Sequence, residues 1–126
     1  MGTRSITYVY EDGKKLMAMY RQMDGYPSGH GLELAKFLDG MVVVNGFGSD
    51  TPSKAANGIG CLAAQLISEF KDGIGGIYIT PTTAKDNEDY GYHLYSDMTV
   101  KVTEFGKKIF AGSVAEFKTF CENTDD

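Results

Sequence analysis

Met98-Thr99-Val100-Lys101-Val102-Thr103 carries the clearest evidence on the fold of this chain, because apolar and polar residues alternate along it. Successive side chains of a β-strand point to opposite faces of a sheet, so the three polar residues share one face. A sheet with one polar and one apolar face is typical of antiparallel pairing. A turn at Phe105-Gly106 and a returning run over residues 107–111 follow, and together they predict a β-hairpin.

A similar hairpin is predicted near the start of the chain. Residues 6–10 alternate as a strand, Glu11-Asp12-Gly13-Lys14 supplies a turn whose Asp-Gly pair tolerates positive φ, and residues 15–21 return. Two further strands are predicted over residues 76–80 and 90–95. The short β-branched run over residues 41–45 fits either a strand or buried coil, and a short strand is the favoured interpretation.

The second of three predicted helices has the most regular pattern. An apolar stripe at helical spacing predicts that it packs on the sheet, with Thr51-Pro52 or Ser53 at its start and Gly73 at its end. Gly58 and Gly60 lie within the stripe and each costs about 1 kcal/mol relative to Ala, which predicts a close approach by another backbone. The stripe comprises Ala55, Ile59, Leu62, Ala63, Leu66, Ile67 and Phe70.

The other two helices are predicted over residues 31–39 and from the capping box Ser113-Val114-Ala115-Glu116 onward. The acidic end of the chain, residues 122–126, is expected to fray. Residues 1–126 are therefore predicted to form a single α+β domain, in which a mostly antiparallel sheet of about five strands has helices packed on one face.

Composition argues against several function classes. A net charge of -5 with scattered Lys and Arg argues against a nucleic-acid-binding protein, because such proteins usually carry a basic patch. Cys61 and Cys121 lie in predicted helices among apolar neighbours, which fits free thiols in a reducing compartment. The chain has no apolar run that resembles a secretory signal or a membrane span, so we expect a cytoplasmic protein with no membrane partner.

Asp24-Gly25-Tyr26-Pro27-Ser28-Gly29-His30-Gly31 carries the chemically richest side chains of the chain in one loop. Three interpretations stay open. The glycines and Asp24 could serve only to build the turn, or exposed aromatic and polar groups could form a recognition surface. Asp24, Ser28 and His30 also contain the residue types of a hydrolytic triad, although triads normally combine separate parts of a fold. Arg21, just before the loop, could hold an anionic partner or pair with Asp24.

Other motifs give no cofactor or metal site. Gly58-Ile59-Gly60-Cys61-Leu62-Ala63 matches a dinucleotide fingerprint, but no strand leads directly into it. Residues 86–97 hold several carboxylates that invite a calcium interpretation, but Tyr90 occupies the fifth position of that template. A solvated acidic loop is the better interpretation. His30 and His93 show no close pairing with each other or with a cysteine that would predict zinc.

Three segments together resemble a family of small proteins from phage and bacterial genomes with no established activity. They are Met1-Gly2-Thr3-Arg4-Ser5, the segment from Tyr20-Arg21 through the loop ending at Gly31, and residues 56–66. The resemblance covers most of the chain. It implies a phage-related genomic setting and no particular mechanism.

Our first hypothesis is a non-enzymatic binding or regulatory protein, a phage-related accessory factor, that acts through the loop 24–31. Its candidate binding residues are Arg21, Asp24, Tyr26, Ser28 and His30, and its partner is an unknown protein or a small anionic ligand. The alternative is a small hydrolase or anionic-ligand-binding enzyme in which Asp24 and His30 act as acid and base with Arg21. Seven tyrosines on predicted strands fit either a core margin or an interface, so a homodimer is a further expectation.

Overall fold

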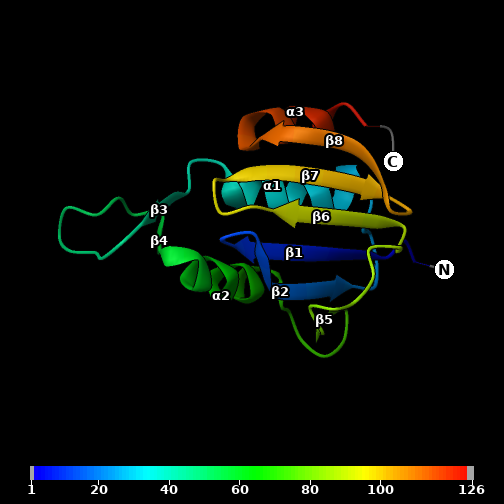
Figure 1. Ribbon diagram of the computed structural model, residues 1–126, viewed down its shortest axis with the longest axis horizontal. Helices are drawn as coiled ribbons and strands as arrows, with labels where there is room; N and C mark the ends of the chain where they lie inside the picture. Colours follow the sequence, from blue (N-terminus) through cyan, green and yellow to red (C-terminus); the bar gives the residue numbers. More distant parts are fainter. Residues whose placement is uncertain (1, 125–126) are drawn as a thin grey trace.

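A mixed β-sheet forms the centre of the computed structural model, which describes residues 2–124 (Figure 1). Six strands of the described chain pair in the order β5-β2-β1-β6-β7-β8. The central strands β1 and β6 run parallel, and every other neighbouring pair is antiparallel. These strands are β1 (Ser5–Glu11), β2 (Lys14–Arg21), β5 (Ile77–Thr80), β6 (Tyr90–Leu94), β7 (Thr99–Glu104) and β8 (Lys107–Ser113). The α+β class is confirmed, with six strands in place of about five.

Both predicted hairpins are present. At the turn between β1 and β2, Asp12 and Gly13 adopt φ of 52° and 81°, and between β7 and β8, Phe105 and Gly106 adopt 50° and 81°. Two successive positive φ values suit the right-handed twist of paired strands. Strand β6 lies between the two hairpins, parallel to β1 and antiparallel to β7, which places segments from both halves of the chain side by side (Figure 1).

Three α-helices of the described chain pack on one face of the sheet. They are α1 (Leu32–Leu38), α2 (Gly58–Phe70) and α3 (Val114–Glu122), and a π-helical turn, η1 (Pro27–Gly31), leads directly into α1. The capping box predicted for α3 is present, because the Ser113 side chain accepts from the backbone of Glu116 and the Glu116 side chain accepts from the backbone of Ser113. Cys61 lies in α2 and Cys121 in α3, both as free thiols.

The predicted start of the second helix is wrong. Residues 55–57 form a strand, β4 (Ala55–Asn57), which pairs in parallel with the short predicted strand near residue 43, β3 (Val42–Val44). The helix begins only at Gly58, whose φ of +85° interrupts the helical backbone. A Cβ on Gly58 or Gly60 would meet no other atom within 4 Å, so the expected close approach is also absent.

The face opposite the helices is only partly open to solvent: Thr99 and Lys101 of the predicted polar pattern are half-buried, and Thr103 is buried. Residues 81–89, the strap, cross this face and leave Tyr8 fully buried and His93 almost so. Thr103, expected on a wet face, is buried and donates to the Asp86 carboxylate of the strap. The solvated acidic loop predicted here is therefore wrong for Asp86, because side chains on the sheet hold this residue in place.

At the C-terminal end, α3 stops at Glu122, and residues 125–126 of the tail expected to fray lie outside the described residues. Within residues 2–124, no helix has the length and apolar character needed to cross a bilayer.

Candidate functional site

The loop 24–31 is fixed to the sheet at several points. The amide of Gly25 donates to the carbonyl of Thr3, and the buried Tyr92 hydroxyl donates to the carbonyl of Gly25 over 2.7 Å. A Cβ on Gly25 would lie 2.8 Å from the backbone of Arg4, so only glycine fits between the loop and β1. This packing explains why the loop is so closely specified, and it supports the structural interpretation for that part of the loop.

His30 lies in the interior, with none of its surface exposed. The Arg21 guanidinium, which can only donate, lies 3.1 Å from Nδ1, so Nδ1 is the acceptor. The proton of the neutral ring is then on Nε2, which donates to Thr7 Oγ1 over 2.7 Å. Burial, followed by the charge of Arg21, lowers the pKa of His30 to about 3. His30 is therefore an uncharged link between β1 and Arg21.

Arg21, the last residue of β2, is held from two sides. Its Nε donates to the carbonyl of Met23 over 2.7 Å, and its Nη1 donates to His30. On its outer side, Nη1 and Nη2 contact the two carboxylate oxygens of Glu33 at 3.2 and 3.3 Å. The Arg21 side chain is 16% exposed and that of Glu33 is 55% exposed, so a well-fixed cation faces a solvent-exposed carboxylate.

The five predicted site residues separate into two groups. Arg21 and His30 are in direct contact, whereas Asp24 and Tyr26 form a second pair on the outside of the loop, where the Tyr26 hydroxyl donates to Asp24 Oδ1 over 3.2 Å. This hydrogen bond raises the pKa of Tyr26 above its ordinary value. Ser28 is half-buried on η1.

The triad of Asp24, Ser28 and His30 is not assembled. Both ring nitrogens of His30 are engaged by Thr7 and Arg21, and the contact between Asp24 and His30 is a backbone hydrogen bond. A base in a triad must reach its nucleophile with one nitrogen and its carboxylate with the other.

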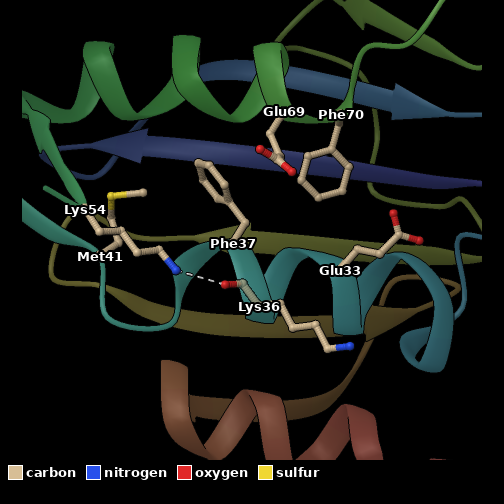
Figure 2. A pocket seen from close by; sticks show the side chains of 7 residues that line it. All are labelled: Glu33, Lys36, Phe37, Met41, Lys54, Glu69 and Phe70. Carbon is tan, nitrogen blue, oxygen red and sulfur yellow. Dashed lines mark hydrogen bonds between the residues drawn. The ribbon is translucent and has the colours of Figure 1, made fainter.

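Two adjoining hollows lie along α1 and α2, and Arg21 lines the second of them. One, of about 500 Å³, opens between α1 and α2, and Figure 2 shows Phe37 of α1 and Phe70 of α2 pointing toward one another within it. The other, of about 380 Å³, is lined by Arg21, Met23, Asp72 and the segment 75–77 that leads into β5. Glu33, Glu69 and Phe70 line both hollows, which we call together the α1–α2 groove.

An apolar floor connects the two halves of this groove. The rings of Phe37 and Phe70 lie 6.4 Å apart, and Phe70 lies 5.0 Å from the buried ring of His30. Met41 closes the far end, where Lys54 Nζ donates to the carbonyls of Lys36 and Asp39 and so caps α1. The groove therefore offers an apolar surface that ends at a fixed guanidinium.

Thr7, Glu33 and Phe70 belong to this site but were not among the predicted residues. Thr7 gave a misleading signal, because Ser5 and Thr7 alternate with Ile6 and Tyr8 and so indicate a polar face, whereas the structure buries Thr7 against His30. The sequence contains no signal for Glu33 or Phe70, because their position beside Arg21 depends on how the helices pack.

A second polar cluster lies under the strap. His93 Nε2 contacts Asp86 Oδ2 at 2.7 Å, and His93 Nδ1 contacts the Tyr10 hydroxyl at 2.8 Å. Burial acts to raise the pKa of Asp86, but hydrogen bonds from His93 and Thr103 outweigh it and the pKa is lowered. Burial, with the nearby Tyr95, raises the pKa of Tyr10 to about 12, so its phenol stays protonated at neutral pH.

The cluster under the strap is best interpreted as a clamp, because His93 and Thr103 hold Asp86 of the strap against the sheet while Tyr10 supports His93. No group of three or more His, Cys, Asp or Glu side chains within residues 2–124 is arranged to hold a metal ion.

No family model, curated protein or solved structure matches this chain. The functional interpretation therefore depends on the chemistry of the site itself.

Proposed function

We propose that this chain is a non-enzymatic binding protein that holds an anionic group of its ligand on Arg21, with the rest of the ligand in the α1–α2 groove. The observation that carries the proposal is the fixation of Arg21 by His30 and Met23, which leaves its outer edge, now in contact with Glu33, at the hollow of about 380 Å³ that continues into the α1–α2 groove. A cation that is already oriented loses little conformational freedom when it binds.

In this proposal the loop 24–31 acts mainly as a support. His30 anchors Arg21 from the interior and does not touch the ligand, whereas the outer residues Asp24 and Tyr26 lie on the other side of the loop. The phage-related accessory role expected from the sequence remains part of the proposal. The size of the groove supports a small molecule, because ligand pockets typically measure about 300–1,000 Å³.

The enzymatic alternative has less support. It needs Asp24 and His30 as an acid–base pair, but the Asp24 carboxylate accepts from Tyr26 and the His30 ring is occupied on both nitrogens. An imidazole with a pKa near 3 is also a poor proton acceptor at neutral pH.

The test uses the two arginines of the chain as a matched pair. Arg21→Lys keeps the charge but loses the fixed fork, whereas Arg4→Lys changes an arginine that pairs with Glu88 and lines neither hollow of the groove. We expect a small carboxylate such as 3-phenylpropionate to shift the Arg21 Nε–H resonance in NMR spectra of the wild type. We expect Arg21→Lys to weaken binding roughly tenfold or more, and Arg4→Lys to leave it unchanged.

Backbone amide spectra of both variants establish that the fold is intact. Equal affinities of folded Arg21→Lys and wild type would contradict the proposal, and so would the absence of any response from Arg21 to anions.

A further inference from the structure

We infer that the ligand is a carboxylic acid with an apolar body, and that Glu33 occupies the position of its carboxylate in the free protein. This inference rests on the proposed function and adds the ligand class. It is carried by the lengths of the contacts around Arg21, by the charges of the groove and by the exposure of Glu33.

The two contacts on the outer side of Arg21 are longer than charge-assisted hydrogen bonds normally are. The inner contacts to Met23 and His30 are 2.7 and 3.1 Å long, and the outer contacts to the Glu33 carboxylate are 3.2 and 3.3 Å long. Charge-assisted hydrogen bonds are normally about 2.7–2.9 Å long, so the Glu33 carboxylate is bound in the fork geometry but only loosely. The two Nη groups of Arg21, which we call the Arg21 slot, are placed to bind both oxygens of a carboxylate. The Glu33 carboxylate binds there at longer distances than usual.

Glu33 is suited to leave this slot. Its side chain lies at the rim of the groove and is 55% exposed, so water can hydrate its carboxylate after the side chain moves away from Arg21. An exposed ion pair contributes little, and its loss converts to at most roughly a fivefold change in affinity. An incoming carboxylate can therefore displace Glu33 at small cost.

The charge around Arg21 favours a monoanion. Glu33, Glu69 and Asp72 line the same hollow as Arg21, which is the one cationic residue among the described residues that line it. An anion that displaces Glu33 still meets Glu69 and Asp72 there, whereas Lys36 and Lys54 line the other hollow, so a monoanion is repelled less beside Arg21 than a phosphate dianion.

The floor of the groove requires an apolar body on this acid. Phe37, Phe70 and Met41 line the larger hollow, and Phe70 also borders the hollow that contains Arg21. A ligand with its carboxylate on Arg21 can therefore cover the aromatic rings with a hydrocarbon chain or ring. Burial of this surface contributes about 25 cal/mol per Å², which an acid without a body cannot gain.

The experiment compares Glu33→Gln with Glu69→Gln as a matched control. Both variants remove one negative charge from the groove, but only Glu33 occupies the Arg21 slot. Binding of 3-phenylpropionate, acetate and phenylphosphonate is measured by calorimetry on the wild type and both variants. We expect 3-phenylpropionate to bind best, and Glu33→Gln to bind it roughly three- to fivefold more tightly than the wild type. Glu69→Gln should show less than half of that gain.

The outcomes separate this inference from the proposed function. If the wild type binds 3-phenylpropionate through Arg21 but Glu33→Gln gains no more than Glu69→Gln, Glu33 is not the stand-in and only this inference fails. Tighter binding of phenylphosphonate than of 3-phenylpropionate, or equal binding of acetate, overturns the ligand class. If no probe binds any variant and the Arg21 resonance never shifts, the proposed function fails as well.

Discussion

His30 uses a titratable ring as an uncharged hydrogen-bond link. Its Nε2–H donates inward to Thr7 and its Nδ1 accepts from Arg21, so one ring connects the central strand β1 to the cation at the groove. A protonated ring would lose its acceptor and place a second positive charge beside Arg21. The orientation of Arg21 therefore depends on a histidine that remains neutral.

Thr7→Val tests this link, because valine has nearly the same shape but no acceptor for the Nε2–H. A buried donor left without a partner costs about 1–3 kcal/mol, so we expect the free energy of unfolding to fall by that amount in urea titrations. The Arg21 Nε–H resonance should also broaden. Thr83→Val, at an exposed position of the strap, is the matched control and should change the stability by less than about 0.5 kcal/mol. Equal stability of the two variants would contradict the link.

Only part of the candidate site could be predicted from the types of individual residues. Arg21 and His30 were recognised by their chemistry, but their contact with each other and with Thr7 joins residues from β1, β2 and η1. Residue type shows that a buried imidazole needs partners, whereas the identity of those partners depends on sheet register and helix placement. Asp24 was grouped with His30 because the two are close in sequence, yet its side chain faces Tyr26.

Among the elements, the start of α2 shows how an apolar stripe can mislead. Ala55 and Ile59 are four residues apart and fit a helix, but Gly58 has φ of +85° and β4 precedes it. Local signals, such as the Asp12-Gly13 turn and the Ser113 capping box, were predicted well because they depend on neighbours in sequence. The pairing of β4 with β3 depends on residues more than ten positions away, and no local pattern indicates it.

Alanine substitutions of Gly58 and Gly60, at the start of α2, are expected to change the stability of the protein in opposite directions. Gly60→Ala lies within α2, and its Cβ meets no other atom within 4 Å, so it should stabilise the protein by about 0.4–1 kcal/mol. Gly58→Ala must adopt a positive φ and should destabilise it by about 1 kcal/mol or more. Thermal unfolding of the two variants checks both signs. Stabilisation by Gly58→Ala would contradict the helix start described above.

The strap is the element that sequence patterns did not reveal, and Asp86 is its main attachment. Asp86→Ala leaves His93 Nε2 and the Thr103 hydroxyl without their carboxylate partner. We expect a loss of about 1–3 kcal/mol in unfolding free energy and faster hydrogen exchange at residues 82–89. The exposed Asn87→Ala is the control within the same segment. Unchanged exchange in Asp86→Ala would show that the strap is held by other contacts.

For the whole molecule, the sheet divides the polar chemistry between two faces. The helix face carries the groove and the Thr7–His30–Arg21 link, whereas the opposite face carries the clamp under the strap. The sheet ends in two open edges, β5 and β8, and β8 carries Lys107 and Lys108, which discourage pairing with another strand. The homodimer expected from the sequence stays a prediction.

The acid stability of the whole protein should report the state of His30. Its pKa is lowered from the ordinary value of 6.5 to about 3, so between these values the unfolded chain binds a proton that the folded chain does not. Stability therefore rises with pH in this window and falls on acidification. We expect the free energy of unfolding to drop by about 2 kcal/mol between pH 7.5 and 5.

Carboxylates make a separate contribution at lower pH. The pKa values of Asp86, Asp97 and Glu116 are lowered, so their contribution to stability is present above their ordinary values of 3.8, 3.8 and 4.5 and is lost below them. The range from pH 7.5 to 5 therefore lies above these transitions.

The same pH series on His93→Gln, which keeps His30, isolates the His30 contribution. In the folded protein the His30 ring resonances should stay unchanged over this range, and their titration there would show that the ring is not the neutral link on which the orientation of Arg21 depends.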